Sequence, residues 1–207
     1  GIEYFAPTLK HKYGMNPLTV TVKPGLDTDI GNKNLSNFIN SGYSNLLVSP
    51  DAQAMRTLNK VGLMESGFSY FGWLIAIHTA VLRIADNFGI NLIFYGEDGE
   101  VEYGGDMKYA FKPYNDFQIR DKHYFSKISP NYWKKYKINP VKLEKFEPPP
   151  LNEVIKNKTQ MHFFGYYKFW DPQENFYYCQ KNTNFQVNPN RTEGTYSKYA
   201  SLDDKLD

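Results

Sequence analysis

Short β-branched runs alternate with stretches of helical spacing along the first half of the chain. The runs at 18–22 and 45–48 predict strands. Between them, apolar residues from 30 to 39 recur close to every third or fourth position, which predicts a helix. Because parallel neighbours need a crossover of this kind, the alternation predicts parallel strands.

The longest apolar stretch runs from Gly67 to Ala85 and predicts a helix over 67–88 that is covered on most sides. Ser69, His78 and Arg83 interrupt it, and it falls short of the roughly 20 apolar residues that cross a bilayer. We therefore expect a core helix and no membrane insertion. A helix from about 51 to 61, capped by Ser49 or Asp51, precedes it.

A third strand is expected over 90–95, and the loop that follows, 96–106, contains five carboxylates and four glycines. Ligands of open α/β sheets gather outside the carboxyl ends of strands. Glycines let the backbone approach a ligand, and carboxylates hold cations or accept protons. The sequence thus predicts a ligand site here, with a solvated acidic turn as the alternative.

After this loop the chain becomes rich in Lys, Tyr, Phe and Asn, and its periodicity weakens. We expect three parts: an α/β core over 1–106, an aromatic-rich insertion over 107–157, and a return to the core with a substrate-side C-terminal loop over 158–207. The expected elements of the last two parts are helices at 120–128, 130–137 and 151–157, a strand at 161–167, and a helix that opens at 171–174.

The formal net charge of +2 gives no electrostatic footprint for nucleic acid. Cys179 is the single cysteine, so an internal disulfide is impossible, and its aromatic surroundings predict a core position. The first residues lack the basic start and apolar run of a signal peptide. A reducing, cytoplasmic location fits these features best.

Several polar and aromatic residues admit both a structural and a functional interpretation. His78 and His162 lie within apolar elements and are expected to be core histidines. Tyr166, Tyr167 and Trp170 have rings that suit stacking on a sugar, although packing is the expected role.

Asp27 and Asp29 have the acid-x-acid spacing by which nucleotide-sugar glycosyltransferases hold a divalent cation on a diphosphate. Only about 22 residues precede them after the start of the first helix, too few for the nucleotide-binding half of such an enzyme. This glycosyltransferase hypothesis is kept as an alternative.

Three long strings make the chain resemble the N-acetyl sugar amidotransferase family. They are residues 91–106 (NLIFYGEDGEVEYGGD), 165–178 (GYYKFWDPQENFYY) and 191–207 (RTEGTYSKYASLDDKLD), with the prolines of 148–150 between them. The resemblance covers nearly the whole chain. It implies a pyrophosphate-loop (PP-loop) ATPase fold of the adenine nucleotide alpha-hydrolase-like type: α/β, with an open, mostly parallel sheet and helices on both faces.

The resemblance implies an ATP-dependent reaction on a nucleotide-linked or free N-acetyl sugar. ATP adenylylates the acetamido oxygen and releases pyrophosphate, and ammonia from a glutaminase subunit then displaces AMP to leave an acetamidino group. Mg²⁺ and basic groups neutralise the phosphates. Such enzymes act in lipopolysaccharide O-antigen and nonulosonic acid (pseudaminic or legionaminic acid) biosynthesis.

Two features of the family are expected but are not in the chain. The Ser-Gly-Gly-x-Asp-Ser phosphate loop belongs just before the first helix, where only Gly1-Ile2-Glu3 stands, and the zinc-binding cysteines belong further upstream. We therefore expect an internal fragment or truncated product. A non-catalytic nucleotide- or sugar-binding role is the second alternative, and homo-oligomerisation is left open.

Residue roles follow from the resemblance, with no catalytic residue assigned. The nucleotide-binding candidates are Val22 and Lys23, at the strand end that passes the adenine, and Gly96 and Glu97, near the α-phosphate. The candidates for substrate or phosphate binding are Glu100, Glu102, Arg191, Thr195, Ser197 and Lys198. Asp106 is the candidate metal ligand.

Overall fold

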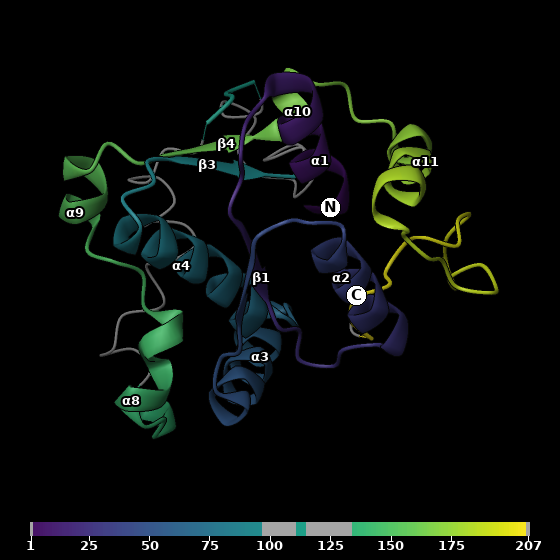
Figure 1. The fold of residues 1–207 in the computed structure, drawn as a ribbon. Helices are drawn as coiled ribbons and strands as arrows, with labels where there is room; N and C mark the ends of the chain where they lie inside the picture. Colours follow the sequence, from purple (N-terminus) through teal and green to yellow (C-terminus); the bar gives the residue numbers. More distant parts are fainter. Residues whose placement is uncertain (1, 97–110, 115–133, 206–207) are drawn as a thin grey trace.

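The computed structural model describes residues 2–96, 111–114 and 134–205. They form a mixed α/β fold whose short strands are surrounded by helices (Figure 1). The strands are β1 (Thr19–Val22), β2 (Asn45–Val48), β3 (Leu92–Tyr95) and β4 (Gln160–Phe163). β1 pairs with β2 and β3 pairs with β4, both in parallel. The predicted α/β class with parallel strands is confirmed, but the described strands form two two-stranded sheets instead of one continuous sheet.

The described helices include eight α-helices and two 3-10 helices. The α-helices are α1 (Ile2–Tyr13), α2 (Asp29–Asn40), α3 (Ala52–Ser66), α4 (Phe71–Asn87), α8 (Pro140–Leu143), α9 (Leu151–Lys156), α10 (Phe164–Tyr167) and α11 (Pro172–Thr183). The 3-10 helices are η3 (Lys134–Tyr136) and η4 (Glu144–Phe146).

Side-chain caps explain where three of these helices begin. Thr28 accepts a hydrogen bond from Gly31 N at the start of α2. Asp51 caps α3 by accepting from two backbone amides, so Asp51 and not Ser49 is the cap. Asp171 does the same for α11. Each oxygen satisfies amides that have no partner within their own helix.

Helix α4 lies across both sheets and organises the core. Its first half packs with Val22 of β1 through residues such as Ile75, and its second half packs with Ile93 of β3 through Leu82. The predicted apolar helix is thus confirmed, and its covered sides explain its composition. It begins later than predicted, because Gly67 ends α3 in the left-handed conformation (φ 69°).

Helices α3 and α4 pack closely against each other after this turn. Within the described residues no single helix has the length and apolar character to span a membrane, and α3 with α4 meets that test only as a pair bent by 119°.

The other face of β3 is covered by aromatic residues of α1 and α10. Phe94 packs with Tyr4 and Phe164 there, whereas its neighbours Ile93 and Tyr95 face α4. This alternation places β3 between two helical layers, as expected for a buried parallel strand.

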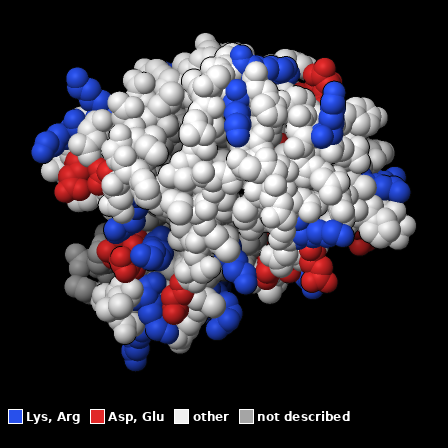
Figure 2. Space-filling view, in the orientation of Figure 1, with Lys and Arg blue, Asp and Glu red and all other residues white. Residues whose placement is uncertain are grey.

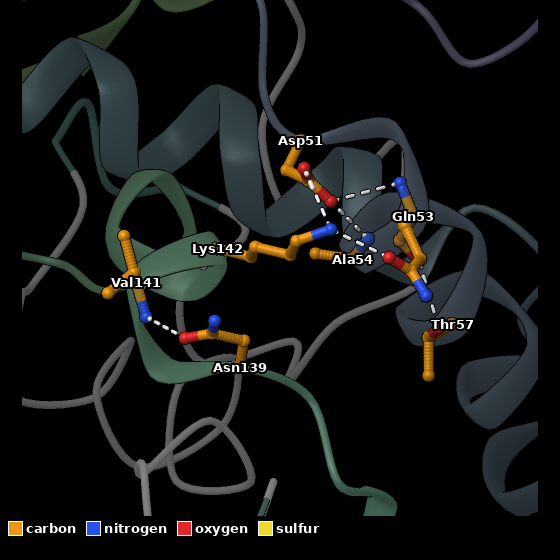
Figure 3. A network of polar contacts seen from close by, with 7 residues as sticks. All are labelled: Asp51, Gln53, Ala54, Thr57, Asn139, Val141 and Lys142. Atoms are coloured by element: carbon orange, nitrogen blue, oxygen red, sulfur yellow. Dashed lines mark hydrogen bonds and ion pairs between the residues drawn. The ribbon is translucent and has the colours of Figure 1, made fainter.

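Residues 134–146 pack against the core formed by α3, α4 and β1, and α8 within them lies beside the start of α3 (Figure 3). Leu143 and Phe146 are buried in that core. Lys142 Nζ donates to Gln53 Oε1 at 2.7 Å and lies 3.5 Å from Asp51 Oδ2, which joins α8 to the first turn of α3. The second half of the predicted insertion is therefore an integral part of the hydrophobic core.

Two further predicted elements differ from the structure, and a third cannot be compared. The strand predicted for 161–167 ends at Phe163, and α10 follows without a break. An aromatic run carries no periodicity that separates strand from helix, which explains the error. Of the helix predicted for 130–137, the described part contains only the short η3. The helix predicted for 120–128 lies outside the described residues.

Charged side chains of both signs are mixed on the face drawn in Figure 2. Basic and acidic groups surround a broad uncharged centre on this side. The described surface in this view therefore carries no continuous field of one sign, in keeping with the small net charge.

Candidate functional site

A small pocket of about 70 Å³ opens beside the carboxyl end of β1. It is lined by Pro24, Gly25, Asn59, Tyr70, Trp73, Asp203 and Asp204. These residues come from the loop after β1, from α3, from the start of α4 and from the C-terminal segment. Pockets for whole drug-sized ligands measure roughly 300–1,000 Å³, so this one can take only part of a ligand as large as a nucleotide.

The C-terminal segment forms one wall because it folds back onto the loop after β1. Leu26 N donates to Asp204 Oδ2 at 2.9 Å, and Lys205 N donates to Leu26 O at 3.0 Å. Thr28, the cap of α2, also donates its hydroxyl to Leu202 O. Residues about 175 positions apart in the sequence thus meet at the strand end.

Asn59 fixes the opposite wall at the start of α4. Its Oδ1 accepts a hydrogen bond from Gly72 N at 2.8 Å. Tyr70 precedes the helix but gives no side-chain cap, so Asn59 satisfies one of the free first-turn amides from the neighbouring helix. The pocket is therefore built at a helix start held by a side chain of α3.

The lining residues favour a flat ring with a polar edge. Tyr70 and Trp73 offer aromatic surface, and Asp203 and Asp204 offer carboxylates. The buried Nε1 of Trp73 has no hydrogen-bond partner among the described residues, and leaving such a donor unpaired is costly. The aromatic surface together with the acidic residues suits a heteroaromatic ring that carries hydrogen-bonding groups.

The strand-end candidates lie next to this pocket, but their side chains do not line it. Val22 is buried in the core, 5% exposed. Lys23 is exposed, and its Nζ lies 3.6 Å from Asp27 Oδ2. The predicted position is thus near a pocket, and the residues of this loop that line it are the next two, Pro24 and Gly25.

The carboxylate-rich loop cannot be compared with the structure beyond its first residue. Gly96 directly follows β3 and is partly buried. Glu97, Glu100, Glu102 and Asp106 lie outside the described residues. Their predicted roles stay predictions.

The hydroxyl and ammonium groups predicted to bind phosphate make hydrogen bonds within their own loop, and their predicted role stays a prediction. Thr195 Oγ1 donates to Thr192 O at 2.9 Å, and Lys198 Nζ donates to Pro189 O at 2.8 Å. Arg191 is exposed, and Ser197 is partly buried with its backbone bonded within the loop. The segment that reaches the pocket is 202–205, a few residues further on.

Of the acid-x-acid pair, Asp27 makes local polar contacts and Asp29 begins a helix. Asp27 accepts from Asn32 Nδ2 at 2.8 Å, and this bond, together with the nearby Lys23, lowers the pKa of its carboxyl. Asp29 is the exposed first residue of α2. The described part of the chain contains no group of three or more His, Cys, Asp or Glu residues placed to hold a metal ion.

The two histidines behave differently. His78 is 9% exposed, and its Nδ1 lies 3.0 Å from Tyr95 Oη, so the predicted core role is confirmed. His162 is only partly buried, with its Nδ1 2.6 Å from Tyr167 Oη, and desolvation lowers its pKa. Trp170 packs with the core around α1, whereas Tyr166 is 55% exposed.

Cys179 is expected to resist thiol reagents in the folded protein. Burial raises the pKa of its thiol from 9.0 to about 12, and the thiolate is the reactive form. Labelling with a maleimide at pH 8, followed by mass spectrometry, should show almost no adduct in buffer and complete modification in denaturant. Rapid labelling of the folded chain would contradict the buried position. The thiol of the unfolded chain ionises at a lower pH than the buried thiol. Cys179 therefore also lowers the free energy of unfolding as the pH rises from about 9 towards 12.

None of the described site residues named individually from the sequence lines the pocket, although the strand end that they mark lies beside it. A usable signal exists for Asn59, because it lies on the buried face of α3 between Met55 and Gly62 and interrupts an apolar stripe. A polar residue at such a position needs a partner, and here the partner is the start of α4.

Fold and site together define a mixed α/β chain with a small pocket, lined by aromatic and acidic residues, at the carboxyl end of a parallel strand. No protein-family model matches the chain, and no curated protein is significantly similar to it.

Proposed function

We propose that the chain is an ATP-dependent N-acetyl sugar amidotransferase of the PP-loop ATPase type. The observation that supports this best is the pocket beside β1, because the resemblance implies that adenine passes the end of that strand. The parallel α/β fold with helices on both faces of β3 is compatible with it.

In this proposal the chain orients ATP and the acetamido group so that the amide oxygen attacks the α-phosphorus. Pyrophosphate leaves, ammonia adds to the activated carbon, and AMP leaves with the former amide oxygen, which gives the amidine. An unactivated amide is a poor electrophile, so adenylylation precedes nitrogen transfer. The pocket holds the base and leaves the phosphates outside it, in keeping with its volume and its two carboxylates.

Mg²⁺ is part of the proposal as the ion that neutralises the phosphates. The described residues do not include a cluster that fits it, and Asp106 lies outside them. The proposed setting is the cytoplasm, with a glutaminase subunit as the ammonia source and surface-polysaccharide precursors as the sugar substrates.

A non-catalytic nucleotide-binding role is the second candidate. It is favoured by the fact that the described pocket offers aromatic surface for a ring but no Lys, Arg or His among its lining residues to contact phosphates. The glycosyltransferase hypothesis gains no comparable support, because Asp27 is already engaged by Asn32 and Lys23.

The test incubates the chain with α-labelled ATP, Mg²⁺, ammonium and a nucleotide-linked N-acetyl sugar. We expect AMP and pyrophosphate, with the sugar product 1 Da lighter because NH replaces O. The matched reaction without ammonium should not yield the amidine. Binding of ATP without AMP release would favour the non-catalytic role, and release of a nucleoside diphosphate from the sugar donor would favour the glycosyltransferase.

A further inference from the structure

We infer that Asn59 is the residue that selects the base in the pocket, through its side-chain Nδ2. It favours a ring with a hydrogen-bond acceptor next to an exocyclic amine, as in adenine, over a ring with N–H next to a carbonyl, as in hypoxanthine. This inference rests on the proposed function for the choice of a purine. It adds that Asn59 is the side chain that discriminates between bases and that adenine is the preferred base.

The orientation of the Asn59 amide is set by the protein. Gly72 N–H can only donate, and it lies 2.8 Å from Asn59 Oδ1, so the oxygen must face the start of α4. The Nδ2 donor consequently points the other way. A side-chain carbon placed on Gly25 would lie 4.0 Å from Nδ2, which locates this donor beside the pocket-lining loop after β1.

Close packing holds this amide in place. A side-chain carbon on Gly72 would lie 3.0 Å from Asn59 Oδ1 and 2.8 Å from Leu58 Cβ, so α3 and the start of α4 touch at this point. Gly72 is buried, and Asn59 is partly buried. A donor fixed in this way discriminates between ligands, because it cannot rotate to offer its oxygen without leaving Gly72 N unsatisfied.

The pocket supplies a complementary acceptor beside this donor. Asp203 and Asp204 line the same small space, and a carboxylate accepts several hydrogen bonds through its two oxygens. A donor from Asn59 and an acceptor from the C-terminal segment match a ring edge with an acceptor nitrogen and an amino group. Hypoxanthine presents a donor and an acceptor in the reverse order, so both contacts would be repulsive.

Asn59→Asp is the sharpest change, because it keeps an acceptor for Gly72 N and replaces the Nδ2 donor with oxygen. The added charge lies at the start of α4, where a helix tolerates an anion well. The fold should therefore persist, which a melting curve checks. Asn152→Asp, on the exposed face of α9, makes the same charge change away from the pocket.

The experiment titrates the chain with adenosine and, separately, with inosine, and follows the indole N–H resonance of Trp73 by NMR. We expect wild type and Asn152→Asp to bind adenosine at least about tenfold more tightly than inosine, because both polar contacts fit adenine and neither fits hypoxanthine. In Asn59→Asp the preference should vanish or reverse, since the new oxygen accepts from the N–H of hypoxanthine.

Equal affinities in the wild type, no binding of either nucleoside, or an unchanged ratio in a folded Asn59→Asp protein would overturn the inference. These outcomes are independent of turnover. If the base preference is found while ATP yields no AMP, the assignment of Asn59 stands and the amidotransferase proposal fails.

Discussion

Gly62→Ala is expected to lower the free energy of unfolding by about 3 kcal/mol, at the upper end of the usual cost of overpacking. A methyl carbon at this position would lie 2.2 Å from Phe71 Cβ and 2.7 Å from Phe68 O. Both atoms move only with the backbone, so α4 must shift away from α3 to make room. The better helix propensity of alanine returns only about 1 kcal/mol. Urea denaturation followed by circular dichroism measures the difference.

Gly42→Ala is the control for this change. Gly42 has φ +88° and no atom within 4 Å of the added carbon, so the substitution costs backbone strain of about 1 kcal/mol without a clash. If Gly62→Ala were no more destabilising than Gly42→Ala, the tight contact between α3 and α4 would be contradicted. The contact between α3 and α4 also holds Asn59 in place, so a shift of α4 should weaken adenosine binding as well.

The local elements were predictable where one signal dominated. The apolar run at 45–48 became β2 with the predicted bounds, and the acid at Asp51 capped α3. Prediction failed where the signal was ambiguous, as in the aromatic run after Phe163, whose helical continuation is decided by packing of Phe164 beneath α1. The division of the described strands into two sheets depends on pairing between distant segments, which a local pattern does not contain.

The location of the pocket was partly predictable and its composition was not. The end of β1 was singled out on the strength of the resemblance, and a pocket lies beside it. Its walls, however, come from four segments that meet only in the folded chain. Asp203 and Asp204 reach the pocket because their backbone and side chains bond to the loop after β1. Contacts of such long range depend on the whole fold, which no short motif records.

The prediction of an aromatic-rich insertion did not say where that segment packs. Tyr136, Leu143 and Phe146 lie against the core of α3, α4 and β1. Arg83 of α4 also donates its Nε to Glu147 O at 2.7 Å, which holds the end of the segment. Weak periodicity in the sequence therefore conceals a short stretch in which a few residues are fully buried.

Phe146→Ala is expected to cost about 4 kcal/mol of unfolding free energy, because a fully buried ring leaves a cavity that the surrounding helices fill only in part. Val141→Ala is the matched control, since Val141 belongs to the same segment and is 78% exposed; its cost should stay within about 0.5 kcal/mol. Chemical denaturation of both variants decides the matter. If both substitutions had similar, small effects, residues 134–146 would contribute little to the hydrophobic core. A large effect of Phe146→Ala alone would show that this segment is a structural part of the domain. It would then also help to position α3, and through Asn59 the pocket.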